Sequence, residues 1–181
     1  MDAAYGVTGA SGAPYARLPI SALVEAAGEP YREAGKTVTY TTAAGRDADA
    51  QPVEEPLVAR SPEIMHGLGN LIQNAAQFAV RAVDVTISWS EETVAVDIVD
   101  DGPGFPQAVL ARIGEPYISG RAGEAEHMGL GIFIAESLLE RTGAHLSFAN
   151  LPDGGAQVVV EWRRAQLEGM DVKVPLKEAG E

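Results

Sequence analysis

The residues best able to do chemistry begin with a polar stripe along one predicted helix. His66, Asn70, Asn74 and Gln77 recur at the spacing of a single helix face. An amide oxygen is a neutral ligand suited to Mg²⁺ that already carries phosphate oxygens and water. A solvated helix face is the alternative, but Asn is a poor helix former and its repetition one turn apart needs a reason.

A glycine-containing acidic loop is the second chemical feature. The sequence Asp-Asp-Gly-Pro-Gly-Phe at residues 100–105 follows a stretch with strand-like alternation. Asp100 at the end of that strand could accept a hydrogen bond from an exocyclic amine such as that of adenine. Gly102 and Gly104 would let the backbone approach a flat base closely. A simple turn without a ligand is the alternative, because these residue types are also common in turns.

A third feature is the sequence Gly-Leu-Gly at residues 129–131. We expect a helix to start near Gly129, with Leu130 and Gly131 in its first turn, and to end at Gly143. Free backbone N–H groups at such a helix N-terminus would suit phosphate. Alone, Gly129 could merely end a loop. The three features together, in this order, indicate a nucleotide site.

Local patterns predict the elements that carry these residues. Ser61 before Pro62 is typical of a helix start, and Ser21 is expected to cap a shorter helix. We expect helices near 22–27, 62–80, 106–113 and 129–143, and strands near 37–42, 85–90, 93–99, 144–149 and 156–163. Helices interleaved with hairpin-paired strands predict the α/β class, as a two-layer α/β sandwich with a mixed sheet, and argue against a Rossmann fold.

Composition limits the organisation and the partners. The 181 residues, 46% hydrophobic and 22% charged, suit one globular domain, which we place at residues 15–163 between a leader (1–14) and a C-terminal tail (164–181). The net charge of −13 makes nucleic acid and anionic membrane unlikely partners. The chain has no cysteine, and we find no signal peptide or membrane-spanning stretch.

These motifs resemble the catalytic and ATP-binding domain of bacterial sensor histidine kinases, which belong to the GHKL ATPases and have the Bergerat fold. Residues 70–75 are similar to the family's N box, and the resemblance implies that Asn74 holds Mg²⁺ with Asn70 in the same site. Residues 100–104 resemble the first glycine box, in which Asp100 would read adenine. Residues 129–132 resemble the second glycine box.

The resemblance also implies an ATP lid over residues 114–128, which we expect to be mobile without nucleotide. Tyr117 falls where the family has its aromatic F box. Many members have a lysine three residues after the second asparagine, where this chain has Gln77. Neutralisation of the phosphates would then rest on Mg²⁺ and on Arg121 of the lid.

The implied function is that of a protein histidine kinase domain. It would transfer the γ-phosphate of Mg-ATP to a histidine on a separate dimerisation domain of the same kinase, and a response regulator would be reached through the full-length protein. His66 lies in the ATP-site helix and is not taken as the phosphoacceptor. We expect the fragment to be cytoplasmic, the inner portion of a membrane-anchored kinase, without direct membrane contact.

Two other functions stay open, and a resemblance to one subfamily narrows the histidine kinase assignment. An ATP-hydrolysing clamp would have a glutamate one turn before the metal-binding asparagine, where this chain has Asn70. A degenerate docking domain would have lost the glycine boxes. Residues 13–20, 67–70 and 75–79 are similar to the redox-responsive RegB/PrrB/ActS kinases of proteobacteria, although redox sensing does not follow from this chain.

Overall fold

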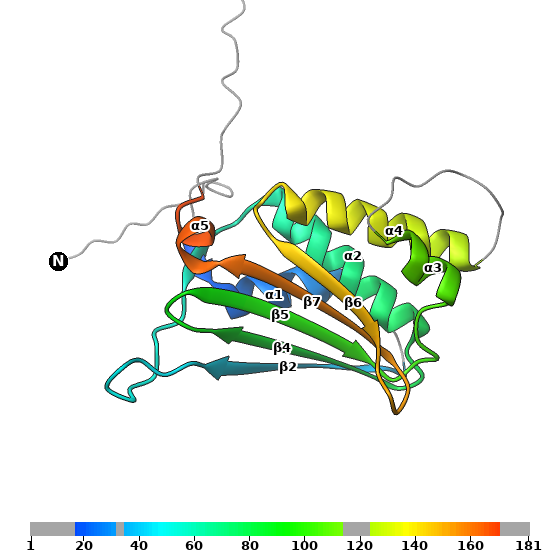
Figure 1. Ribbon diagram of the computed structural model, residues 1–181, viewed down its shortest axis with the longest axis horizontal. Coiled ribbons are helices and arrows are strands. Elements are labelled where there is room, and N and C mark those ends of the chain that lie inside the picture. Colours follow the sequence, from blue (N-terminus) through cyan, green and yellow to red (C-terminus); the bar gives the residue numbers. More distant parts are fainter. Residues whose placement is uncertain (1–16, 32–34, 114–123, 171–181) are drawn as a thin grey trace, which may run out of the picture.

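The computed structural model describes residues 17–31, 35–113 and 124–170, which form a five-stranded sheet with helices on one face (Figure 1). The strands lie in the order β2 (Thr37–Ala44), β4 (Ala82–Trp89), β5 (Thr93–Asp100), β7 (Ala156–Arg163) and β6 (His145–Asn150). β2 runs parallel to β4, whereas every other neighbouring pair is antiparallel. The predicted mixed sheet is therefore confirmed.

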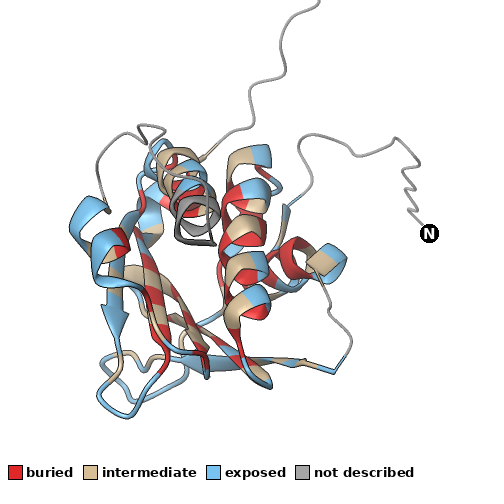
Figure 2. Ribbon diagram, turned by 90° about the vertical axis from the view of Figure 1, so that its right-hand side faces the viewer, coloured by how far each residue is buried: buried red, intermediate tan, exposed pale blue. Residues whose placement is uncertain are grey.

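Three helices form the second layer. α2 (Pro62–Phe78) is central and contacts both α1 (Ile20–Gly28) and α4 (Glu124–Glu140), while the short α3 (Gln107–Arg112) packs on α4 and η1 (Glu29–Tyr31) on α1 and α2. Alternate residues of β5 are buried on the side of the helices. Figure 2 shows the buried residues gathered between the helices and the sheet, so the predicted two-layer α/β sandwich is confirmed.

Helix α2 starts where the sequence predicts. The Ser61 hydroxyl accepts a hydrogen bond from the Ile64 N–H at 3.3 Å and donates to the Glu63 carboxylate at 2.9 Å. Pro62 occupies the first turn, where its missing N–H costs nothing. Ile64, Leu68 and Ile72 then form a fully buried apolar stripe on one side of the helix. The amide stripe, which consists of Asn70, Asn74 and Gln77, lies on the other side.

Four short elements, η1 among them, were not predicted from the sequence. β1 (Arg17–Pro19) and β3 (Leu57–Ala59) form a separate antiparallel pair, and α5 (Arg164–Glu168) lies within the segment taken as a tail. Each spans five residues or fewer, so none has a periodicity to detect.

The predicted cap of α1 is wrong. This helix begins at Ile20 without a side-chain cap, and the Ser21 N–H instead donates to the Glu55 carboxylate at 2.8 Å. Ile20 is fully buried, and its backbone N–H donates to the Pro56 carbonyl at 3.1 Å, so contacts outside the helix hold its first residue. Within the described ranges, no helix is long and apolar enough to cross a membrane.

Substitution of Gly67 should destabilise the fold, because α2 and α4 are in close contact there. A Cβ atom at this position would lie 2.5 Å from Cγ of the fully buried Leu139. Overpacking of this kind costs about 1–3 kcal/mol, and the higher helix propensity of alanine offsets about 1 kcal/mol of it, so we expect Gly67→Ala to lower the free energy of unfolding by up to about 2 kcal/mol in urea titrations. In the Gly67→Ala/Leu139→Ala double variant the loss should be smaller than the sum of the single losses. Additive losses would show that the two residues are not in contact.

Candidate nucleotide site

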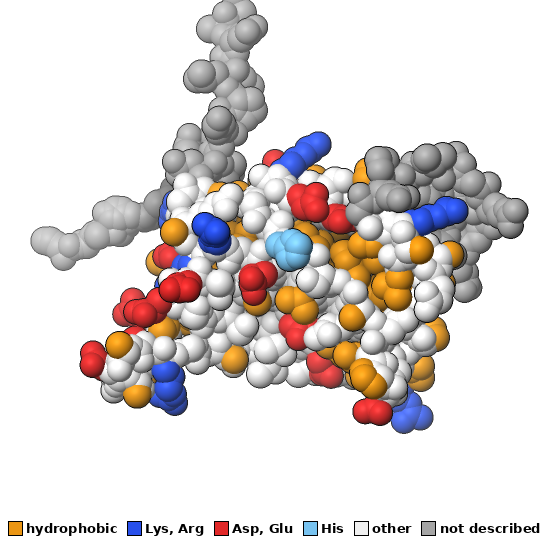
Figure 3. All heavy atoms as spheres, in the orientation of Figure 1, with side chains coloured by type: hydrophobic (Ala, Val, Ile, Leu, Met, Phe, Trp, Pro, Cys, Tyr) orange, Lys and Arg blue, Asp and Glu red, His pale blue; other side chains and the backbone are white. Residues whose placement is uncertain are grey.

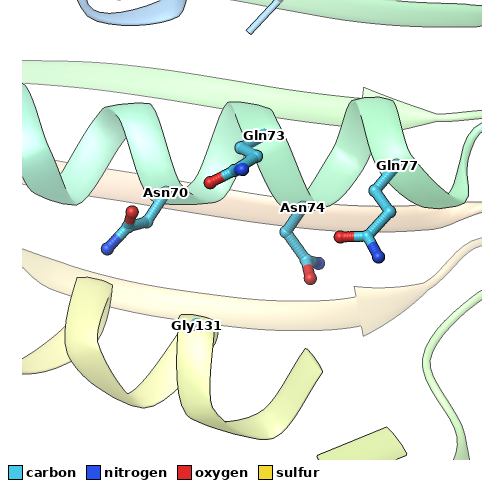
Figure 4. Close-up of a pocket in the computed structure, with 5 residues that line it drawn as sticks. All are labelled: Asn70, Gln73, Asn74, Gln77 and Gly131. Atoms are coloured by element: carbon cyan, nitrogen blue, oxygen red, sulfur yellow. The ribbon is translucent and has the colours of Figure 1, made fainter. Parts of the chain in front are cut away.

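An open cavity of about 360 Å³ lies between α2 and α4. It is lined by Asn70, Gln73, Asn74, Gln77 and Gly131. In Figure 4 the side chains of Asn70, Asn74 and Gln77 project from one side of α2 toward the part of α4 that carries Gly131. The volume falls within the range of small-molecule sites, about 300–1,000 Å³. The predicted amide stripe and one glycine of the predicted Gly-Leu-Gly sequence thus meet in one site.

Among the described residues, the side chains that line this cavity are all carboxamides, and they carry no formal charge. Each amide offers both a hydrogen-bond acceptor and donors. Gln73 also lines the cavity and was not predicted from the sequence. Its position one turn from both Asn70 and Gln77 is the signal that could have placed it at the edge of the site. On the molecular face drawn in Figure 3, acidic and basic side chains are scattered. Over the whole chain the acidic residues outnumber the basic ones, and the net charge is −13. A neutral polar lining suits a metal-bound anion better than a free one.

Asp100 ends strand β5 in a buried position. Its side chain is 6% exposed, and one carboxylate oxygen accepts the Gly102 N–H at 2.8 Å. Burial raises the pKa of Asp100, and hydrogen bonds from the backbone N–H groups of Gly102 and Ala156 oppose that rise only in part. A buried carboxylate held in this way is an acceptor available to a ligand donor.

The loop after Asp100 reaches the end of helix α2. A Cβ atom on Gly102 would lie 2.3 Å from the carbonyl oxygen of Phe78, so only glycine fits at this contact. Phe78 directly follows Gln77, which lines the cavity. The structure therefore brings the acidic loop to the end of the helix that carries the amide stripe.

Asp101 has a different environment from its neighbour. Its carboxylate accepts the backbone N–H groups of Val80, Arg81 and Ala82, at 2.8, 3.0 and 3.2 Å. These hydrogen bonds, the one from Arg81 above all, lower the pKa of Asp101. Asp101 thus holds the turn that joins α2 to β4, a role that the sequence analysis did not identify.

The prediction that a helix begins near Gly129 is wrong. α4 begins at Glu124, so Gly129, Leu130 and Gly131 lie inside the helix, where backbone N–H groups bond within it. Residues 124–128 include Ala, Met and two Glu, whose helix propensity outweighs the effect of the following glycine. In the described structure these glycines therefore offer no helix N-terminus to a phosphate. Leu130 is 42% exposed.

Two predicted site residues lie outside the described residues. Tyr117 and Arg121 belong to residues 114–123, which the structure does not describe, and the predicted lid falls there for most of its length. Its last residues, 124–128, belong to α4.

Comparison with known proteins identifies relatives of this chain. The family described as histidine kinase-, DNA gyrase B- and HSP90-like ATPase matches residues 59–166. The sensor histidine kinase RegB of Cereibacter sphaeroides is 42% identical over 145 residues, which cover 76% of this chain and 31% of RegB. The sensor histidine kinase GtrS of Pseudomonas aeruginosa is 28% identical over 151 residues, which cover 83% of this chain and 29% of GtrS. The predicted resemblance to RegB-type kinases is confirmed, and the chain spans about a third of these relatives' length.

Solved structures agree on the fold. The catalytic domain of histidine kinase ThkA superposes with a TM-score of 0.59 at 20% identity, over 83% of this chain and 97% of that domain. Full-length ShkA in complex with AMPPNP gives a TM-score of 0.61 at 22% identity, over 84% of this chain and 32% of ShkA.

The two adjacent carboxylates should have opposite effects on the pH dependence of stability. The folded-state pKa of Asp100 is raised, so its contribution is complete below the unfolded pKa and is lost as pH rises through the folded value. The folded-state pKa of Asp101 is lowered, so its contribution is present above the unfolded pKa and is lost as pH falls through the folded value.

We therefore expect Asp100→Asn to gain stability relative to the wild type as pH rises from about 2.5, below the unfolded pKa of both groups, to about 7, and Asp101→Asn to lose stability relative to the wild type over the same range. Urea denaturation at both pH values measures each difference, and effects that do not depend on pH cancel. Slopes of the same sign in the two variants would contradict the assignment.

Proposed function

The chain belongs to the family of histidine kinase-, DNA gyrase B- and HSP90-like ATPases, and on that premise we propose that it binds Mg-ATP and transfers the γ-phosphate to a histidine on a separate dimerisation domain. The observation that carries the proposal is the cavity in which Asn70, Asn74 and Gln77 face Gly131, with the buried Asp100 loop at the end of the same helix. The sensor kinases among the relatives support phosphotransfer as the reaction.

The adenine end of the nucleotide is assigned to the acidic loop. Asp100 accepts the hydrogen bond of the exocyclic amine, and its burial strengthens that bond because little water competes for it. Gly102 and Gly104 present backbone without side chains to the flat base. The close contact with Phe78 also requires glycine at position 102, so this residue contributes both to packing and to the proposed ligand site.

The phosphate end is assigned to the amide stripe. Asn74 provides an oxygen ligand for Mg²⁺, Asn70 lies one turn away in the same cavity, and Gln77 donates to a phosphate oxygen. Bound Mg²⁺ would neutralise phosphate charge. The chain's own contribution is to orient the nucleotide, since phosphoryl transfer depends mostly on position and electrostatics. Tyr117, Arg121, Gly129 and Leu130 complete the proposed nucleotide set.

The side chains lining the cavity disfavour the ATP-hydrolysing clamp. Activation of water needs a general base within hydrogen-bond reach, and the described lining consists of amides and a glycine. We propose in addition that the domain acts in the cytoplasm, where ATP is available, and that a response regulator receives the phosphate from the full-length kinase.

Transfer of labelled phosphate tests this function. The chain is incubated with γ-labelled ATP, Mg²⁺ and a dimerisation domain of the same kinase that carries the acceptor histidine. Acid-labile, base-stable label should appear on the added domain and not on the chain. The Asn74→Ala substitution should abolish the part of this labelling that depends on Mg²⁺. Release of free phosphate without transfer would support a clamp. Absence of any nucleotide-induced thermal shift would favour a docking domain.

Gly131→Ala should separate stability from binding. No atom of the described residues outside the helix's own backbone lies within 4 Å of a Cβ atom at this position, and alanine is favoured over glycine in a helix by about 1 kcal/mol. We therefore expect the nucleotide-free variant to unfold at a higher temperature than the wild type. Its added methyl group enters the cavity, so the stabilisation by Mg-ATP should shrink. Stabilisation by Mg-ATP equal to that of the wild type would exclude Gly131 from the binding surface.

A further inference from the structure

We propose that Asn150 is a positioning residue for the adenine-binding loop, an inference that rests on the proposed nucleotide function. Asn150 ends strand β6, 45 residues from Phe105. Its side-chain oxygen accepts the Phe105 N–H at 2.7 Å, and its side-chain nitrogen donates to the Phe105 carbonyl at 2.9 Å. A carboxamide is the side chain that can satisfy both backbone groups of one residue in this way.

The loop lies directly against this amide. Gly104 has φ +88°, and a Cβ atom there would lie 2.8 Å from the Asn150 side-chain oxygen. Glycine is required for both reasons, since it tolerates positive φ and leaves room for the amide. The loop backbone thus packs against the Asn150 side chain at the end that carries Gly104 and Phe105.

The same hairpin contacts the other end of the loop. Gly155, with φ +97°, would place a Cβ atom 2.2 Å from the Asp100 carbonyl oxygen. The Leu151 N–H donates to the Gly155 carbonyl at 2.9 Å and closes the turn between β6 and β7. The β6–β7 hairpin therefore contacts the loop at both Asp100 and Phe105. These two contacts fix the distance between the two ends of the loop.

Side-chain packing supports the same arrangement. Phe105 is 5% exposed, and its ring meets that of Phe148 edge-on at 6.0 Å and 72°. Phe148 lies two residues before Asn150 on β6, so one strand holds Phe105 by its ring and by its backbone. The ring contact keeps Phe105 in the core without Asn150. The amide adds the orientation of the backbone between Gly102 and Phe105, on which the approach to a base depends.

Measurement of nucleotide affinity and base preference tests this role. We expect Asn150→Ala to weaken Mg-ATP binding in calorimetry by about tenfold, to narrow the preference for ATP over GTP, and to leave the Mg²⁺ dependence unchanged, since Asn74 lies on α2. Gln157→Ala is the matched control, because Gln157 lies on the same hairpin and its amide donates to Asp97 at 3.1 Å. The control should keep both affinity and preference.

The outcomes separate this inference from the proposed function. A wild-type chain that binds no nucleotide would overturn both. Wild-type binding together with an unchanged ATP preference in Asn150→Ala would overturn the positioning role alone. If Asn150→Ala fails to fold, Asn150→Asp replaces it, since that side chain still accepts the Phe105 N–H but sets an acceptor against the Phe105 carbonyl. A wild-type base preference in Asn150→Asp would likewise overturn the role.

Discussion

The site depends on helix α2 being enclosed on most of its circumference while one strip stays open. Leu68 and Ile72 are fully buried in the core. Gly67 admits Leu139 of α4, and Gly69 lets the Tyr31 ring approach, with a Cβ position 2.9 Å from that ring. A helix wedged between neighbours at glycine contacts cannot rotate, because any turn would drive a side chain into a packed interior. The direction of the amide stripe is therefore set by contacts on the other sides of the helix.

The adjacent carboxylates Asp100 and Asp101 have different environments, which suit the binding role proposed for Asp100 and a structural role for Asp101. Successive residues at a strand end point to opposite sides, so Asp101 meets the turn after α2 while Asp100 points into the core. Asp101 is saturated by backbone donors and stabilises the fold. The raised pKa of Asp100 shows that its own hydrogen bonds do not offset the cost of burial. A buried carboxylate with a raised pKa is typical of a binding site, where a ligand donor can add a further hydrogen bond.

Local signals explain what could be predicted and what could not. The start of α2 followed from Ser61 and Pro62, and the hairpin strands followed from alternation, so the fold class and the amide stripe were within reach of the sequence. The start of α4 could not be predicted in this way. Glycines at 129 and 131 suggested a helix boundary, but the preceding residues, which favour helix, extend α4 back to Glu124. The pairing of Asn150 with Phe105 spans 45 residues and exists only once β6 lies beside the loop. Contacts of that kind have no periodicity to detect.

The charge distribution bears on the metal proposed for this site. The chain carries −13, and the described lining of the cavity supplies no cation to an anionic ligand. The C-terminal end of α2 would add a partial negative charge beside Gln77. Lys36 reduces it, since its ammonium group donates to the carbonyls of Ala76 and Gln77 at 2.6 and 3.0 Å. With that repulsion lowered, the amides could bind phosphate oxygens whose charge Mg²⁺ had partly neutralised, which is the metal dependence that the proposed function requires.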